Sequence, residues 1–180
     1  MKSLSGKDTF VLDSNTFIAP YRNYYAMDHF PSYWSWLKDE FAMYESKLVL
    51  PKIVYAELTS SPDRLANWVR AELQPFVYVG YENEPLVWGK YQQIINFIHT
   101  SGYFTGAGIS NWDQNGKADP LLIAMAAAYG WKIVTFEQSA GRLSKKNPTS
   151  KEPKIPDVAA AFEVDCVDIF LLEEKFNLVI

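Results

Sequence analysis

Four acidic residues, far apart in the chain, each stand at a position where chemistry is a reasonable expectation. They are Asp13, Glu57, Asp119 and Glu137. Two of them follow short apolar runs, one opens a helix-like segment, and one lies in a short apolar stretch. If one sheet brings the four carboxylates together, they form an oxygen-ligand site for a hard divalent cation, Mg²⁺ or Mn²⁺. Such a site indicates metal-assisted cleavage of a phosphodiester.

Asp13 and Asp119 each have a second, purely structural interpretation. Asp13 could close its own turn by accepting a backbone N–H, but a buried strand does not require a carboxylate at its end, which favours a functional role. Asp119 precedes Pro120, and Asp followed by Pro is a good helix N-cap and first-turn pair. A helix N-terminus would also help to keep the Asp119 carboxylate ionised for a metal, so the two roles are compatible.

The other acids have ordinary explanations too. Glu57 could be a solvated helical residue, and Glu137 could be a plain loop acid. Asp157 follows Pro156 and is first a helix-start residue, so it is held in reserve as a substitute for Glu137 as the fourth acid. Asp113, in a Gly-rich segment, is a weaker candidate.

Composition narrows the class of protein. At 180 residues and 48% hydrophobic, the chain predicts one domain over 1–180 with a full core. A single cysteine, Cys166, excludes an internal disulfide framework, and the first eight residues lack the apolar core of a signal peptide. The longest apolar stretch is too short to span a membrane, so we expect a cytoplasmic protein without membrane contact. A net charge of −4 argues against bulk attraction to nucleic acid but not against an acidic metal site.

Periodicity predicts alternating strands and helices. The predicted strands are 9–12, 47–50, 132–136 and an edge strand at 164–167, with 76–79 either a strand or an extended connection. The predicted helices run from N-cap Ser32 to Tyr44, from Pro51 through Glu57, from N-cap Ser61 to Leu73, and over 84–99, 120–129 (C-cap Gly130), 156–163 and 168–176. Segments 21–31 and 101–117 are expected to be loops. This order predicts an α/β protein, a three-layer α/β/α sandwich with a central, mostly parallel sheet.

Basic and aromatic residues suggest where a substrate would bind. Segment 141–155 carries Arg142, Lys145, Lys146, Lys151 and Lys154 against the single acid Glu152, which is either a phosphate-backbone contact or a solvated loop. Tyr21, Arg22, Tyr24 and Tyr25 follow the Asp13 turn without helical periodicity, so they either hold bases and phosphates or pack on the surface. The aromatic residues of 33–44 have helical spacing and are predicted to be core.

Other catalytic motifs are missing from the sequence. Neither a dinucleotide-binding G-x-G-x-x-G, nor a P-loop, nor a G-x-S-x-G elbow occurs. A phosphoryl-transfer enzyme with Asp13 as nucleophile is less favoured, because the run Asp13-Ser14-Asn15 lacks the second acid two residues on.

Four short motifs together resemble those of the PIN-domain nuclease family. Val11-Leu12-Asp13-Ser14-Asn15-Thr16 resembles the first-strand motif, and Val54-Tyr55-Ala56-Glu57-Leu58 the helical Glu motif. The run 118–126 resembles the Asp-x-x-(I/L)-A-x-A helix start, and Val134-Thr135-Phe136-Glu137 the strand that ends in Thr-x-Asp. The motifs occur in the family's order. Residues 20–34 and the run 154–158 look closer to a little-characterised prokaryotic PIN-like subgroup, similar to the toxin components of type II toxin–antitoxin systems.

The resemblance implies a fold, a cofactor and an activity. It implies an α/β/α sandwich in which Asp13, Glu57, Asp119 and a fourth acid bind Mg²⁺ or Mn²⁺, so that a metal-bound water attacks an RNA phosphodiester. It also implies a toxin that is silenced by an antitoxin protein, often as a homodimer. Two features depart from the family: the fourth acid is Glu rather than Asp, and segments 20–45 and 100–116 are longer than in compact toxins.

Six residues complete the predicted site as candidates for substrate binding. They are Asn15, Arg22, Thr135, Arg142, Lys145 and Lys146. The leading prediction is therefore a metal-dependent endoribonuclease, and the alternative is a non-catalytic PIN-like module that binds RNA or protein.

Overall fold

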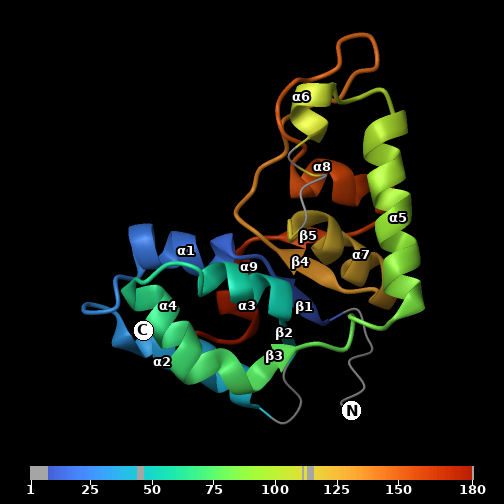
Figure 1. Cartoon of the computed structure of the whole chain (residues 1–180). Coiled ribbons are helices and arrows are strands. Elements are labelled where there is room, and N and C mark those ends of the chain that lie inside the picture. The colour runs from blue at the N-terminus through green and yellow to red at the C-terminus, as the bar shows by residue number, and fades with distance from the viewer. Residues whose placement is uncertain (1–7, 44–46, 111, 113–115, 180) are drawn as a thin grey trace.

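The core of the molecule is a parallel β-sheet with helices on both faces (Figure 1). The computed structural model describes residues 8–43, 47–110, 112 and 116–179. Its strands are β1 (Phe10–Leu12), β2 (Leu48–Pro51), β3 (Val77–Tyr78), β4 (Lys132–Val134) and β5 (Cys166–Val167). Within the described residues they form one five-stranded sheet in the order β3-β2-β1-β4-β5, and every neighbouring pair is parallel. The predicted α/β sandwich with a central parallel sheet is confirmed.

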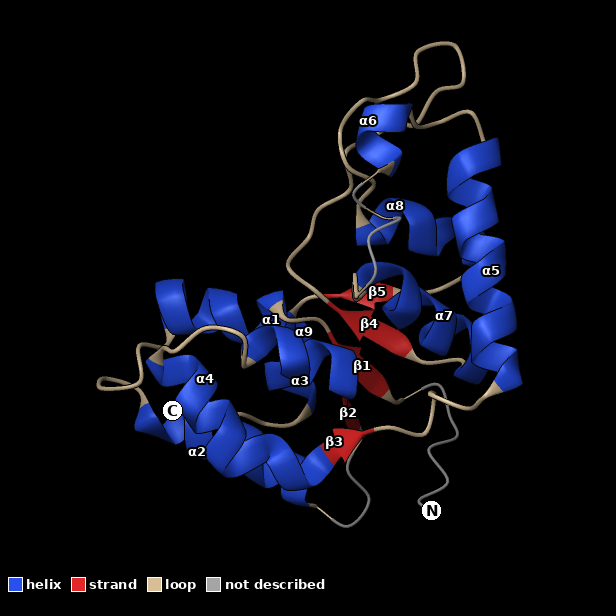
Figure 2. Cartoon of the chain, viewed as in Figure 1, coloured by secondary structure: helices blue, strands red, loops and turns tan. Residues whose placement is uncertain are grey.

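Helices connect the strands and cover the sheet (Figure 2). The α-helices are α1 (Asn15–Ala19), α2 (Pro31–Ala42), α3 (Lys52–Leu58), α4 (Arg64–Trp68), α5 (Pro85–Thr100), α6 (Gly106–Ile109), α7 (Asp119–Tyr129), α8 (Ile155–Ala159) and α9 (Ile169–Lys175). Short π-helical segments η1 (Pro20–Tyr24) and η2 (Val69–Leu73) and 3₁₀ segments η3 (Gln74–Phe76) and η4 (Ala160–Phe162) extend some of them. Helices α5, α7 and α8 lie on one side of the sheet, and α1, α2, α4 and α9 lie on the other.

The strand order creates a topological switch point between β1 and β4. From β1 the chain adds β2 and β3 on one side, then returns to add β4 and β5 on the other. Leu12 of β1 is in register with Val134 of β4, so the residues that follow them, Asp13 and Thr135, leave the sheet side by side. In open parallel sheets the crevice at such a point, at the carboxyl ends of the strands, is where ligands bind.

Apolar strands and one apolar helix build the core around this crevice. All three residues of β1 are buried, as the uninterrupted hydrophobic run predicts for a strand covered on both faces. Helix α7 is buried from Pro120 to Ala126 and packs against α5 and β4. Its small alanine face is thus used inside the chain. Gly130 ends α7 with a φ of 70°, the left-handed cap that was predicted.

Two predicted N-caps are wrong. Helix α2 begins at Pro31 after Phe30, so Ser32 lies inside the first turn and does not cap the helix. Helix α4 is capped by Asp63, whose carboxylate accepts the Ala66 N–H at 2.8 Å, rather than by Ser61. Asp63 has the extended backbone conformation and the side-chain acceptor of an N-cap, whereas α2 starts at its proline without a side-chain cap. Tyr44, the predicted end of the α2 stripe, lies outside the described residues.

Both predicted loops contain helical structure. Residues 20–24 continue α1 as a π-helical turn, because the helix that starts at Asn15 does not stop at Pro20. Segment 101–117 contains α6, which packs beside residues 149–151: a Cβ on Gly108 would lie 2.3 Å from the carbonyl oxygen of Lys151. In the described part of the chain, no helix combines the length and hydropathy that a membrane crossing requires.

Candidate active site

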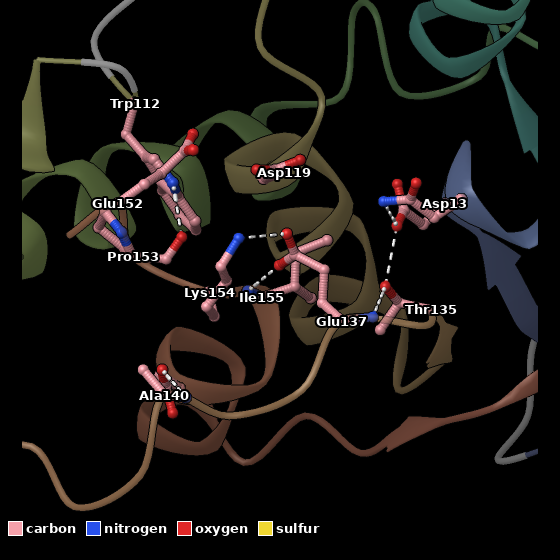
Figure 3. Close-up of polar contacts among 12 residues, drawn as sticks. Asp13, Trp112, Asp119, Thr135, Glu137, Ala140, Glu152, Pro153, Lys154 and Ile155 are labelled. Carbon is pink, nitrogen blue, oxygen red and sulfur yellow. Dashed lines mark hydrogen bonds and ion pairs between the residues drawn. The ribbon is translucent and has the colours of Figure 1, made fainter. Parts of the chain in front are cut away.

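Asp13 is a buried carboxylate at the end of β1 (Figure 3). It is 2% exposed, and its Oδ2 accepts a hydrogen bond of 2.8 Å from the Thr135 hydroxyl and one of 3.4 Å from the Asn15 amide. Burial raises the pKa of Asp13, and the nearby charges of Glu137 and Glu57 raise it further, while the bond from Thr135 acts in the opposite direction. No lysine or arginine pairs with Asp13 among the described residues.

Asp119 is the first residue of α7 and does not act as its cap. The cap position is held by Ala118, and no side chain caps the helix there. The carboxylate instead forms an ion pair of 3.2 Å with Lys117. Burial raises the pKa of Asp119 to about 7; the charges of Asp13 and Glu137 add to the increase and Lys117 opposes it. The capping interpretation is therefore wrong, and the Asp119 carboxylate pairs with Lys117 instead of with the N–H groups of its own helix.

Glu137 follows β4 and is held at both carboxylate oxygens. Oε1 accepts a hydrogen bond from Lys154 Nζ at 3.0 Å, and Oε2 accepts one from the Ile155 N–H at 2.8 Å. Its backbone N–H donates to the Thr135 hydroxyl at 3.0 Å. One threonine thus contacts both Asp13 and Glu137, which fixes these two acids relative to each other.

Glu57 lies at the periphery of the group. Its side chain is exposed on α3, yet its charge contributes to the raised pKa of Asp13. Because α3 follows directly after β2, which is parallel to β1, Glu57 lies toward the carboxyl ends of the strands, as Asp13 does. No hydrogen bond or ion pair of its carboxylate is seen among the described contacts.

The acids interact electrostatically, but their side chains are not arranged to bind one metal ion together. The charges of Glu137 and Glu57 raise the pKa of Asp13, and those of Asp13 and Glu137 raise the pKa of Asp119. Negative charge is therefore concentrated in the crevice (Figure 3). Within the described residues, no three Asp, Glu, His or Cys side chains stand close enough to hold a metal. Shared coordination would therefore need side-chain rotation. The all-oxygen donor set and the uncompensated charge of buried Asp13 fit a hard divalent cation.

Two lysines provide the counter-charges of the site, and sequence reasoning assigned neither to it. Lys117 bridges Asp119 and Glu152, with an Nζ–Oε1 distance of 2.5 Å to Glu152. Lys154 pairs with Glu137. Lys117 lies two residues before Asp119, which was a usable signal. Lys154 was counted in the basic segment, but its contact is visible only in the folded chain.

Asp157 has a different task from the metal-binding role held in reserve for it. Its carboxylate accepts the Ser139 hydroxyl on Oδ1 and the Ala140 N–H, at 3.0 Å, on Oδ2. It therefore holds the loop that follows Glu137. Glu137 is among the charges that raise the pKa values of Asp13 and Asp119. Asp113 lies outside the described residues.

The predicted substrate-binding residues fall into two groups. Thr135 is 3% exposed and Asn15 hydrogen-bonds Asp13, so both support the buried acid instead of presenting a free surface. Arg22 is exposed on η1, and Arg142, Lys145 and Lys146 are exposed after β4. The ammonium of Lys145 lies 5.6 Å from the Tyr103 ring centre. No ion pair of these four with a site acid occurs in the described structure.

Of the aromatic residues after Asp13, one remains available to a ligand. Tyr21 packs edge-on against Trp34, and Tyr25 stacks on Tyr33, so both belong to the body of the protein. Tyr24 is 48% exposed and stacks on Phe136, the residue between Thr135 and Glu137. The predicted core role of the aromatic stripe on α2 is confirmed by buried Tyr33, Trp34 and Phe41.

An open pocket of about 430 Å³ adjoins Glu137. Residues that line it include Thr135, Glu137, Ser139, Pro156, Asp168 and Leu171. It extends from the ends of β4 and β5 to the start of α9. Of the four candidate acids, Glu137 is the one that lines this pocket.

Comparison with known proteins identifies the family. Neither the curated proteins nor the solved structures gave a match to this chain. A family model described as "Domain of unknown function (DUF4411)" matches residues 10–178, which include β1 to α9 and every acid discussed above. The chain belongs to the DUF4411 family.

Proposed function

We propose that this protein is a metal-dependent endoribonuclease that hydrolyses RNA phosphodiesters with Mg²⁺ or Mn²⁺. The observation that carries the proposal is the convergence of Asp13, Asp119 and Glu137 at the β1–β4 switch point, where the Thr135 hydroxyl contacts both the Asp13 carboxylate and the Glu137 N–H (Figure 3). Buried carboxylates whose pKa is raised by burial and by neighbouring acids, as for Asp13 and Asp119, are typical of functional sites. The four motifs that resemble PIN-domain nucleases contain these same acids.

Each residue has a defined task in this proposal. Asp13, Asp119, Glu137 and Glu57 would supply oxygen ligands, and the cation would supply an acidified water and neutralise charge on the phosphate. Thr135 holds the buried Asp13 carboxylate with a 2.8 Å bond, and Asn15 contacts the same oxygen. Asp157 shapes the loop beside Glu137.

Isosteric substitution tests the proposal. End-labelled RNA is incubated with purified protein in Mn²⁺ or in EDTA, comparing wild type with Asp13→Asn and Asp119→Asn. We expect metal-dependent cleavage by wild type and a loss of at least about 100-fold in each variant, the scale seen when one group acting on transition-state charge is removed. Asp165→Asn is the control. Asp165 is exposed and directly precedes β5, so it lies at the amino end of that strand, whereas the candidate acids lie beyond the carboxyl ends of the strands. Equal cleavage by all four proteins would refute the assignment.

A non-catalytic binding module is the second candidate, and one observation favours it. Lys117 and Lys154 already neutralise Asp119 and Glu137. Titration calorimetry with Mn²⁺ separates the two candidates. If wild type is saturated by Mn²⁺ at millimolar concentration or below and Asp13→Asn is not, the nuclease is supported. If the heat of titration is the same in wild type and in Asp13→Asn, the binding module is supported.

The cellular setting is proposed from the resemblance alone. A toxin role predicts that induced expression of the wild type arrests growth and that Asp13→Asn does not. An antitoxin partner and a homodimer belong to the same proposal. Sedimentation of the purified chain, alone and with a candidate partner, would test them.

A further inference from the structure

We infer that Lys154 takes part in the function of the site. Its ammonium pairs with the Glu137 carboxylate when no metal ion is bound, and it contacts a substrate phosphate when a metal ion is bound. This inference rests on the proposed function, because it concerns the same carboxylates.

Lys154 is placed where an incoming cation would have to displace it. Its Nζ lies 3.0 Å from Glu137 Oε1, while Ile155 donates its N–H to Oε2 at 2.8 Å. The backbone bond keeps Glu137 pointing the same way even if the ammonium leaves. The lysine is therefore an exchangeable partner, and the Ile155 N–H is the fixed one.

The ammonium is also accessible and lies within the field of the whole acid group. The Lys154 side chain is 37% exposed, whereas that of Glu137 is 17% exposed. The charges of Glu152 and Asp119 act on it in addition to that of Glu137. A cation at the mouth of an acidic crevice is suited to attract a phosphate that the carboxylates alone would repel.

The other basic residues of the region do not have this combination. Lys117 is 29% exposed and is shared by Asp119 and Glu152, so two carboxylates hold it. Lys145 lies over the Tyr103 ring, and Lys146 is exposed with no side-chain contact among those described to a site acid. Lys154 alone in this group is tied to one acid and partly open to solvent.

Opposite changes in metal and substrate affinity follow from this position. Replacing Lys154 by methionine removes a competitor for Glu137 and a repulsive charge, so Mn²⁺ binding should tighten. It also removes a phosphate contact, so RNA binding and cleavage should weaken. A side chain that merely supports the loop would lower both affinities together.

The experiment compares Lys154→Met, Lys154→Gln and Lys154→Arg with wild type. Calorimetry with Mn²⁺ should show about 3- to 10-fold tighter binding for the Met and Gln variants, within the range of a charge-assisted contact. RNA cleavage should fall about 10-fold or more, chiefly through KM, and Arg should restore much of it because it retains the charge. Binding of a non-cleavable RNA analogue in Mn²⁺, followed by fluorescence anisotropy, should lose about one unit of salt slope in the Met and Gln variants, whereas the slope in EDTA, where Lys154 stays paired with Glu137, should not change.

Lys47→Met is the matched control: Lys47 is an exposed lysine that directly precedes β2, away from the carboxyl ends of the strands, and its loss should leave all three measurements unchanged. If Lys154→Met and Lys154→Gln weaken Mn²⁺ binding together with cleavage, or change neither, the inference is wrong. A wild type that binds no Mn²⁺ and cuts no RNA would instead remove the proposed function on which it rests.

Discussion

The Thr135 hydroxyl donates a 2.8 Å hydrogen bond to Asp13 Oδ2, joining two residues that are 122 positions apart in the chain. The same hydroxyl accepts the Glu137 N–H at 3.0 Å. Because Asp13 and Thr135 follow the registered pair Leu12 and Val134, this contact closes the crevice between β1 and β4. The shortest hydrogen bond to this buried carboxylate thus comes from the neighbouring strand, and the residues of its own turn, Ser14 and Asn15, add longer bonds of 3.4 Å.

Thr135→Val should remove this support with little change of shape. The buried Asp13 carboxylate loses its shortest hydrogen bond, so we expect a loss of about 1–3 kcal/mol in the free energy of unfolding, together with reduced cleavage. Urea denaturation measures the first effect. Thr100→Val is the control, because Thr100 is exposed at the end of α5 and bonds only its own helix, so its loss should be within about 0.5 kcal/mol.

Asp119 should make the stability of the metal-free protein depend on pH. Its pKa rises from the ordinary value of 3.8 to about 7 on folding, so the folded state binds the proton more tightly. The resulting stability is complete below about pH 4 and is lost as the pH rises through about 7. At roughly 1.4 kcal/mol per pKa unit, the loss has an upper limit of about 4 kcal/mol.

Asp119→Asn therefore should unfold at higher urea concentration than wild type at pH 8 in EDTA, and at nearly the same concentration at pH 4. Cleavage should be lost in the same variant, a trade of activity for stability that is typical of functional sites. A wild type whose stability is flat from pH 4 to 8 would contradict the raised pKa.

Divalent metal should stabilise the fold through the acids. Binding to the native state alone adds about 2.7 kcal/mol at a metal concentration 100 times the Kd. We expect Mn²⁺ to raise the Tm of wild type and of Asp165→Asn, and to leave the Tm of Asp13→Asn nearly unchanged. Differential scanning fluorimetry with and without EDTA measures this shift. An equal rise in all three proteins would mean that the ions act elsewhere.

A variant at Glu57 can distinguish an effect on metal binding from an effect on the stability of the fold. Because its side chain is exposed, Glu57→Gln should change the free energy of unfolding by less than about 0.5 kcal/mol. Because its charge reaches Asp13, the variant should weaken Mn²⁺ binding and reduce cleavage. Calorimetry and the RNA assay on the folded variant test both. Unchanged metal affinity would remove Glu57 from the ligand set.

The sequence by itself determined the class of the fold and the positions of the candidate acids relative to the strands and helices. A run such as Phe10–Leu12 is apolar because the strand is covered on both faces, and Gly130 marks the end of α7 because it adopts a positive φ at little cost. Both signals are local, so periodicity and residue type are enough to detect them. The positions of Asp13 and Glu137 can be predicted in the same way, because Asp13 directly follows β1 and Glu137 comes shortly after β4.

Only the tertiary structure decided which groups meet. The bonds from Thr135 to Asp13 and from Lys154 to Glu137 depend on the order of strands in the sheet and on where α8 begins. Local patterns carry no record of these long-range pairings. For that reason the sequence predicts Thr135 as a substrate contact and Asp157 as a reserve ligand, and it shows Lys154 as one charge among several in a basic segment. In the folded chain the Thr135 hydroxyl contacts Asp13, the Asp157 carboxylate accepts the Ala140 N–H, and Lys154 pairs with Glu137.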